Sequence, residues 1–259
     1  MSLIANLFRS GLERMGYALI KPEFSRFGLS LYVDVRRIGR QWGWSTTTVF
    51  DVGANVGQFA AEALAGFPEA TVWSFEPFPK SFAKLVDGGA NARLKPFQLA
   101  LSDRIGESAF FAYSEEGDGS HINSLTDKAR FPQRFGYKPR ELTVKTSTID
   151  AFCSEHGVER IDLLKVDTEG FDLVVLTGAE AMLRAGRVRF IYVEFNDLFE
   201  IPGAEGGALI PIAEYLKRFG YAYLTTYTDF VIYKGEVSVN ANALFVLPPE
   251  SARAPAAYD

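Results

Sequence analysis

The sequence predicts a doubly wound α/β fold built on a mostly parallel sheet. Segments with strand character alternate with segments of helix character along most of the chain. Residues 161–166 form a nearly continuous apolar run, which is typical of a parallel strand covered by helices on both faces. A glycine-rich turn joins the first predicted strand to the helix after it. In such folds ligands bind beyond the carboxyl ends of the strands.

Composition sets the broad class. The 259 residues are 47% hydrophobic and 23% charged, which is the balance of an ordinary globular protein. We expect a helical extension over residues 1–45, a main domain over residues 46–250 and a disordered tail over residues 251–259. The net charge of −5 provides no general attraction for nucleic acid, which we do not expect as a partner. The single cysteine, Cys153, excludes an internal disulfide and suits the cytoplasm, where we expect the protein.

The chain shows no segment that we expect to cross a membrane. No apolar stretch approaches the ~20 residues that span a bilayer, and the N-terminus lacks the pattern of a secretory signal. Residues 3–21 alternate apolar and basic side chains at helical spacing. This helix could pack on the main domain or lie on a membrane surface. The sequence leaves the oligomeric state open.

The elements of the main domain follow from periodicity and from helix start signals. The first half predicts strands at 47–52, 71–75 and 97–101 and helices at 56–65 and 79–90. The second half predicts strands at 161–166, 188–195, 221–226 and 243–247 and helices at 170–185 and 207–219. Between the halves, alternating strands at 107–113 and 142–148 flank a polar segment. Long irregular insertions are usually functional, so we expect substrate contacts in an insert over about residues 106–148.

The glycine turn is the most informative stretch. Residues 49–59 read VFDVGANVGQF, in which Gly53 permits a sharp turn and Gly57 permits a close approach of the helix to the sheet and a ligand. The helix N-terminus offers unpaired N–H groups to the carboxylate of an amino-acid moiety. Asp51, at the strand end, suits the ammonium group or a neighbouring sulfonium charge. The predicted binding turn consists of Asp51, Gly53, Ala54, Asn55 and Gly57.

The end of the second strand narrows the ligand class. It reads WSFEP, which places Glu76 roughly 20 residues after the glycine turn, where a carboxylate can accept two ribose hydroxyls. Pro77 follows in the same predicted site. Ala60 stands where a dinucleotide-binding turn has its third glycine, so we expect a nucleoside ligand without pyrophosphate. Asp103, after the third strand, could receive an adenine amino group, although its surroundings equally suit an ordinary turn.

Charged side chains gather at the ends of the fourth and fifth strands. Asp167 and Glu169 follow the apolar run 161–166 and are candidates for a general base and for acceptor binding. They could equally hold a divalent cation, because hard oxygen ligands suit Mg²⁺, or cap the following helix. The sequence assigns no metal ligand. Lys165 and Glu194 interrupt apolar strands and could contact the acceptor or form structural ion pairs.

The insert contributes two further candidates. His121 could act as the base by closing over the acceptor, because an unperturbed imidazole titrates near neutral pH, or it could be an exposed loop histidine. Asn123 is a candidate for acceptor binding.

The glycine turn, the acidic end of the second strand, IDLLKVDTEGFDLVVLTGA at 161–179 and FIYVEF at 190–195 together resemble the FkbM family of methyltransferases. The resemblance covers about residues 47–196. It implies a Rossmann-like class I methyltransferase fold that uses S-adenosylmethionine, in a family that acts chiefly on hydroxyls of sugars, glycans or natural products. Thr168 stands where the family often has Val or Ile, and Asp172 stands where it often has Glu.

We therefore expect an S-adenosylmethionine-dependent methyltransferase with a small-molecule or saccharide acceptor. A hydroxyl acceptor is favoured, and the sequence leaves a nitrogen acceptor open. One alternative is a nicotinamide-dependent oxidoreductase on a similar sheet. It predicts pyrophosphate-binding glycines and a Tyr-x-x-x-Lys pair near a strand end, and the sequence shows neither. The other alternative is a non-catalytic nucleoside-binding module.

Overall fold

The computed structural model describes residues 15, 26–88, 91–112, 125, 140–195, 208–233 and 236–252, of which residues 229–233 and 236–240 are described by their backbone alone. The predicted helix over residues 3–21, the centre of the insert and most of the tail lie outside the described residues. The predicted domain boundaries stay predictions. Among the described residues no helix has both the length and the apolar character needed to cross a membrane.

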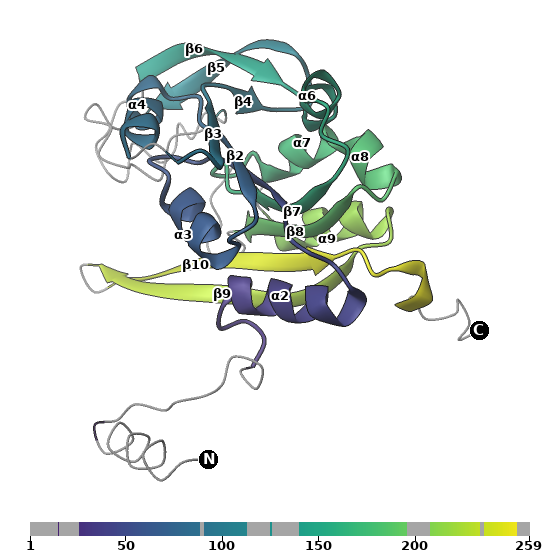
Figure 1. Ribbon diagram of the computed structural model, residues 1–259. Helices are drawn as coiled ribbons and strands as arrows, with labels where there is room; N and C mark the ends of the chain where they lie inside the picture. The colour runs from purple at the N-terminus through teal and green to yellow at the C-terminus, as the bar shows by residue number, and fades with distance from the viewer. Residues whose placement is uncertain are drawn as a thin grey trace.

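A seven-stranded sheet forms the centre of the described structure (Figure 1). In spatial order its strands are β3 (Leu94–Phe97), β2 (Thr71–Phe75), β1 (Thr48–Val52), β7 (Ile161–Val166), β8 (Val188–Phe195), β10 (Glu236–Val246) and β9 (Ala222–Tyr233). The first five strands pair in parallel, and β10 runs antiparallel to both of its neighbours. The predicted Rossmann-like, doubly wound and mostly parallel sheet is confirmed.

Helices cover both faces of this sheet (Figure 1). On one face α2 (Leu31–Trp42) and α3 (Gln58–Gly66) share a hydrophobic cluster with the sheet. On the other face the cluster is shared with α6 (Ile149–His156), α7 (Asp172–Thr177), α8 (Glu180–Arg184) and α9 (Leu209–Lys217). All residues of β7 are buried, with Leu163 in the first cluster and Leu164 in the second. This placement explains the continuous apolar run in the sequence.

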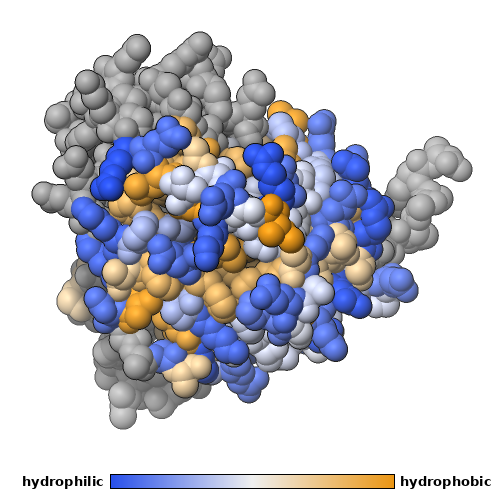
Figure 2. Space-filling view, turned by 90° about the horizontal axis from the view of Figure 1, so that it is seen from above, coloured by the Kyte–Doolittle hydropathy of each residue, from blue (hydrophilic) through white to orange (hydrophobic). Residues whose placement is uncertain are grey.

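A smaller sheet lies beyond β3 and α4 (Pro79–Asp87). It consists of β4 (Ala100–Leu101), β5 (Gly106–Ala112) and β6 (Arg140–Ser147). β5 and β6 lie where strands were predicted on either side of the insert, and they pair antiparallel. Phe78, Phe110 and Val144 form a separate small core beneath it. Figure 2 shows the side of the molecule that carries this sheet, where hydrophobic residues lie toward the middle of the described surface and hydrophilic residues around them.

The third strand was predicted wrongly at residues 97–101. The structure places β3 at Leu94–Phe97, and residues 100–101 pair with β6 in the small sheet instead. Proline is disfavoured in most strands, so Pro96 argued against a strand at these residues. It is tolerated here because β3 is an edge strand, where a missing backbone donor costs little.

The single helix predicted over residues 170–185 is also wrong, because α7 and α8 are separate helices. A Cβ on Gly178 would lie 2.0 Å from the carbonyl oxygen of Ser102, so the chain passes very close to the small sheet here. Asp150 then accepts hydrogen bonds from the backbone of Ala181 and Met182, at 2.8 and 2.9 Å, and caps α8 as a new helix. The break therefore depends on contacts that a local pattern does not contain.

The last two strands form a hairpin and extend well beyond the predicted segments at 221–226 and 243–247. A short 3₁₀ helix, η3 (Glu250–Ala252), is the last element of the described residues.

Candidate active site

A cavity opens where β1, β2 and β7 end. Its walls come from the glycine turn, the start of α3, the end of β2, the small sheet and the loop after β7. The predicted site residues along it are Gly53, Ala54, Asn55, Glu76, Pro77, Lys165, Asp167 and Glu169. The position agrees with the expectation that ligands bind beyond the carboxyl ends of parallel strands.

Glycine is required at two positions of the turn. Gly53 has φ +76°, and a Cβ there would lie 1.9 Å from the carbonyl oxygen of Asp167. Gly57 has φ +92°, and a Cβ there would lie 2.6 Å from Leu85 Cδ1. Such backbone angles and contacts suit glycine alone. The turn is therefore wedged between β7 and α4, as its predicted role in close backbone approach requires.

Glu76 fastens the end of β2 to this turn. Its Oε2 accepts a hydrogen bond of 2.8 Å from the backbone N–H of Asn55, and its Oε1 accepts one of 2.8 Å from Phe78. Burial raises the pKa of the Glu76 carboxyl from its ordinary 4.5 to about 7, although the two backbone donors oppose this shift. Glu76 thus presents a preorganised carboxyl group on the cavity wall.

Lys165 is the centre of a buried ion-pair network. Its Nζ lies 3.2 Å from Asp51 Oδ1 and 3.3 Å from Asp167 Oδ2, and it donates to the carbonyl oxygens of Gly53 and Val52 at 2.8 and 3.3 Å. Burial acts to lower the pKa of Lys165, but the two carboxylates outweigh it and raise the pKa above its usual range. Of the two roles open for Lys165, the structure shows the structural ion pair, and its side chain also lines the cavity.

The same network changes the expectation for Asp51. This residue is completely buried, is not among the cavity-lining residues and faces Lys165. Burial raises its pKa, and Lys165 opposes that shift. In the structure Asp51 holds Lys165 against the turn. The contact of Asp51 with an ammonium or sulfonium group, which was predicted from its place at the strand end, stays a prediction.

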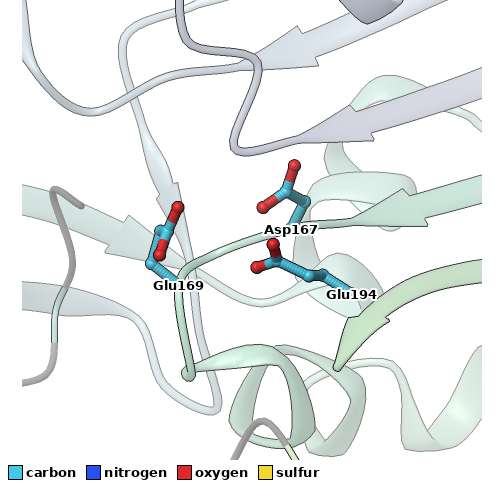
Figure 3. Close-up of side chains that lie close together, drawn as sticks. All are labelled: Asp167, Glu169 and Glu194. Carbon is cyan, nitrogen blue, oxygen red and sulfur yellow. The ribbon is translucent and has the colours of Figure 1, made fainter. Parts of the chain in front are cut away.

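Three carboxyl groups converge beside the cavity, from Asp167, Glu169 and Glu194 (Figure 3). One oxygen of each lies within 4.8 Å of the others. Asp167 follows β7 and its side chain is 36% exposed, whereas Glu194 on β8 is 9% exposed. Burial raises the pKa of Glu194 well above its ordinary value, and the neighbouring charges of Asp167 and Glu169 add to the effect. The cluster concentrates negative charge at one end of the cavity.

The loop that carries Glu169 is held in a fixed shape. Glu169 has φ +58°, an unusual angle for a residue with a side chain. Buried Asp172 accepts hydrogen bonds from Thr168 N at 2.9 Å, Thr168 Oγ1 at 3.1 Å and Gly170 N at 3.2 Å. The sequence had suggested no role for Asp172. Its signal was an aspartate that follows a threonine by four residues at a strand-to-helix turn, where such local hydrogen bonds are common.

Comparison with known proteins identifies the family. The model of the methyltransferase FkbM domain matches residues 51–223, which is more than half of the chain. The chain belongs to the FkbM methyltransferase family. The match includes the glycine turn, Glu76 and the three clustered carboxylates, so these parts of the site lie within the FkbM domain.

Several curated proteins are similar to this FkbM-family chain. The 2-O-methyltransferase NoeI of Sinorhizobium fredii is 31% identical over 58% of this chain and 63% of its own length. The hexuronic acid methyltransferase AglP of Haloferax volcanii is 27% identical over 63% of this chain and 62% of its own length. The 31-O-demethyl-FK506 methyltransferase FkbM of Streptomyces tacrolimicus is 28% identical over 67% of this chain and 72% of its own length. The chain thus spans less than two thirds of NoeI and of AglP.

Some predicted residues of this FkbM domain do not line the cavity. Asp103 is exposed and accepts a hydrogen bond of 3.0 Å from the Ser102 hydroxyl, which is the ordinary turn that the sequence also allowed. Its adenine contact stays a prediction. Glu194 lies behind Asp167 and is not among the lining residues, so this placement does not support direct acceptor contact. His121 and Asn123 lie outside the described residues.

Two further residues that line the cavity were not predicted from the sequence. Tyr192 of β8 stacks on Phe59 of α3 with an interplanar angle of 17° and forms one wall. Asn242 of β10 also lines the cavity and is the direct register partner of Glu194. Tyr192 could have been found, because it lies two residues before Glu194 on one strand and therefore on the same face. Asn242 could not, because its pairing joins distant strands.

Proposed function

We propose that the protein transfers the methyl group of S-adenosylmethionine to a hydroxyl group of a small-molecule or saccharide acceptor. One observation carries this proposal: a single cavity connects the glycine turn and Glu76 at one end with Asp167 and Glu169 at the other. A nucleoside-bearing cofactor and an acceptor that must lose a proton would each find suitable groups there.

The residues of the first end fit an adenosyl amino acid. Each oxygen of Glu76 accepts one backbone hydrogen bond, and a carboxylate has about four lone-pair positions, so each oxygen keeps capacity for one ribose hydroxyl. The first turn of α3 offers backbone N–H groups to the cofactor carboxylate. Ala60 stands on α3, without the third glycine of a pyrophosphate-binding turn. These features favour a nucleoside ligand over a dinucleotide.

The residues of the second end fit an alcohol acceptor. The cofactor supplies a methyl group already activated by a positively charged sulfur. The acceptor hydroxyl loses its proton as its oxygen bonds to the methyl carbon, while the carbon–sulfur bond breaks and leaves its electron pair on sulfur. We assign binding of that hydroxyl and acceptance of its proton to Asp167 and Glu169, which line the cavity. Lys165 fixes Asp167 by their 3.3 Å ion pair and so orients the carboxylate.

The names of two relatives support the acceptor class. NoeI is named a 2-O-methyltransferase and AglP a hexuronic acid methyltransferase. The first name specifies an oxygen as the methylated atom and the second a sugar acid as the acceptor, which agrees with an acceptor end lined by carboxylates. For this chain we propose only the chemical class of the acceptor, a compound rich in hydroxyl groups.

An acceptor screen with radiolabelled S-adenosylmethionine tests the proposal. We expect label to pass to a saccharide or another polyhydroxyl compound and S-adenosylhomocysteine to form in equal amount. Binding of S-adenosylhomocysteine without transfer to any acceptor class would favour a silent binding module. Binding of NAD in place of S-adenosylhomocysteine would contradict the proposal altogether.

A further inference from the structure

We propose that Asp167, Glu169 and Glu194 form a binding site for one divalent cation, and that this cation holds two adjacent oxygens of the acceptor. The second half of this statement rests on the proposed function. The first half concerns the chain alone and is testable without any acceptor or methyl donor.

The separation of the carboxyl oxygens fits a cation. One oxygen from each of the three residues lies within 4.8 Å of the others. Three oxygens spread evenly around one Ca²⁺ can lie up to about 4.5 Å apart, and three around one Mg²⁺ up to about 3.6 Å, from the usual metal–oxygen distances. Small shifts of the side chains would therefore bring the three oxygens onto Ca²⁺, and somewhat larger shifts would bring them onto Mg²⁺. Figure 3 shows the three groups pointing toward a common space.

Glu194 supplies a second and independent reason. Its side chain is 9% exposed, and its Oε2 is buried without a hydrogen-bond partner among the described residues. A buried carboxylate oxygen without a partner is costly, and native structures rarely keep one without a ligand, an ion or a proton. The carboxyl group points toward those of Asp167 and Glu169, and Glu194 is not among the cavity-lining residues. A cation between the three groups would satisfy it.

The charges nearby leave room for a cation. Lys165 carries one positive charge, which it shares between Asp51 and Asp167. Glu194 forms a side-chain hydrogen bond with Asp167, and its carboxyl also faces the charges of Glu169 and Asp172. A further positive charge at the cluster would relieve this repulsion.

The three ligands are carried by rigid structure. The backbone N–H of Asp167 donates to Val52 O at 3.1 Å, which fixes it beside β1. Glu194 lies within the β8–β10 ladder opposite Asn242. Glu169 sits in the turn that Asp172 holds with three hydrogen bonds. Preorganised ligands of this kind favour binding because little order must be created when the ion enters.

The cation would act on the acceptor by direct coordination. Three carboxylates leave coordination positions open on Mg²⁺ or Ca²⁺, and hydroxyl or carboxylate oxygens of a sugar are suitable ligands for them. Two adjacent acceptor oxygens on one ion would fix the acceptor in one orientation beside the cofactor end of the cavity. The ion would also lower the pKa of a bound hydroxyl, and the proton released as the oxygen–methyl bond forms would pass to an oxygen of Asp167 or Glu169 that is not bound to the ion. Asp167 and Glu169 would thus bind the acceptor through the ion and still receive its proton.

Manganese binding to the full chain tests the site directly. After dialysis against EDTA, the protein is titrated with MnCl₂, and free Mn²⁺ is followed by electron paramagnetic resonance. Mn²⁺ shares the preference of Mg²⁺ for oxygen ligands. We expect one bound ion per chain, and affinity at least ~10-fold weaker in Glu194→Gln and in Glu169→Gln, since each loses one charged ligand. The matched control Glu107→Gln changes an exposed residue of β5 and should bind as the unaltered chain does.

Three results would overturn the proposal in distinct ways. Absence of Mn²⁺ binding at millimolar concentration would mean that a proton shared within the cluster, and no metal, satisfies Glu194. Equal Mn²⁺ affinity in Glu194→Gln, Glu169→Gln and the unaltered chain would place the ion elsewhere. If Mn²⁺ binds as expected but EDTA treatment leaves methyl transfer unchanged, the acceptor role of the ion is wrong. Failure of the proposed function itself would appear as lack of S-adenosylhomocysteine binding, which the Mn²⁺ titration does not measure.

Discussion

The carboxyl group of Glu76 has two tasks that its protonation state connects. It accepts hydrogen bonds from the backbone of Asn55 and Phe78, and it is assigned to the ribose hydroxyls when the cofactor binds. Burial raises its pKa to about 7, so near neutral pH a substantial part of the ligand-free protein carries the protonated group. Two hydroxyl donors require the ionised form, which accepts at both oxygens.

We predict that S-adenosylhomocysteine binds more tightly as the pH rises through about 7 and levels off above it. The sign follows from the raised pKa: the protonated form stabilises the empty protein at low pH, and this contribution to the free energy of unfolding is lost as the pH rises from 4.5 to about 7. Glu76→Gln should weaken binding at pH 8 by roughly 10- to 100-fold, because charge-assisted hydrogen bonds are lost, and should flatten the pH dependence. Calorimetry between pH 6 and 8 measures both effects.

The control for this prediction is Glu69→Gln, which changes an exposed residue before β2. It should retain the affinity and the pH dependence of the unaltered chain. An unchanged pH profile in Glu76→Gln would show that another group is responsible for it.

We predict that Asp167→Asn lowers methyl transfer at least ~100-fold while it preserves affinity for S-adenosylhomocysteine. The substitution removes the charge that binds the acceptor hydroxyl, whether the carboxylate acts directly or through an ion. The control Asp87→Asn lies at the exposed end of α4 and should keep full activity. Transfer at the original rate in Asp167→Asn would remove this residue from the reaction.

The sequence predicted those site residues whose role is local. Gly53, Gly57 and Glu76 follow from one turn and one strand end, and the structure places all three as local geometry requires. The pairing of Asp51 with Lys165 could not be predicted, because the two become register partners only when β7 settles beside β1. A strand-end aspartate has the same local signal whether it faces a ligand or a buried lysine.

At the scale of elements, the glycine turn between β1 and α3 determines how closely the chain can pass the loop after β7. Gly53 N and Ala54 N donate to Phe75 O at 3.0 Å each, which ties the turn to β2, while Lys165 ties it to β7. The turn is therefore fixed from two sides before any ligand enters.

We predict that Gly53→Ala lowers the free energy of unfolding by at least about 2 kcal/mol and abolishes binding of S-adenosylhomocysteine. The new Cβ would lie 1.9 Å from Asp167 O, at a φ of +76°. Gly157→Ala is the matched control, because Gly157 has φ +66° with nothing within 4 Å of its Cβ. It should lose only about 1 kcal/mol from backbone strain and keep its affinity. Urea unfolding and calorimetry measure the two quantities; equal losses in both variants would contradict the close approach.

The element predictions succeeded where the residues of a strand are enough to determine its bounds. β1, β2, β7 and β8 lie within a residue of their predicted bounds, because parallel buried strands carry strong apolar runs. The prediction failed at β3, where an edge position tolerates Pro96, and at the break between α7 and α8, where Asp150 from α6 acts across the fold. Both errors arise from tertiary contacts.

We predict that Asp150→Ala costs about 1 kcal/mol of unfolding free energy through loss of the α8 cap, with no change in affinity for S-adenosylhomocysteine. Its carboxylate accepts from the backbone of Ala181 and Met182, far from the cavity lining. Urea unfolding compares Asp150→Ala with Asp87→Ala, which removes an exposed carboxylate at the C-terminal end of α4. No difference between the two variants would mean that α8 does not depend on Asp150.

At the scale of the whole molecule, the order of the strands creates the site. The chain continues from β1 to β2 on one side and from β7 to β8 on the other, so the connections after β1 and after β7 leave the sheet in opposite directions. Such a switch point opens a crevice beyond the strand ends, which is where the glycine turn, Glu76 and Asp167 meet. The small sheet closes the cofactor side of this crevice through Leu99, Leu101 and Phe110. Fold and cavity position were therefore predictable, whereas the acceptor side depends on segments brought together from β7, β8 and β10.

The central claim is that the crevice around the glycine turn and Glu76 holds an adenosyl amino acid. A crystal structure of the chain soaked with sinefungin tests it most directly. We predict electron density for the nucleoside with both ribose hydroxyls on the Glu76 carboxylate and the amino-acid carboxylate at the start of α3. A crevice that stays without ligand density, or that fills with side chains of the protein itself, would contradict the account.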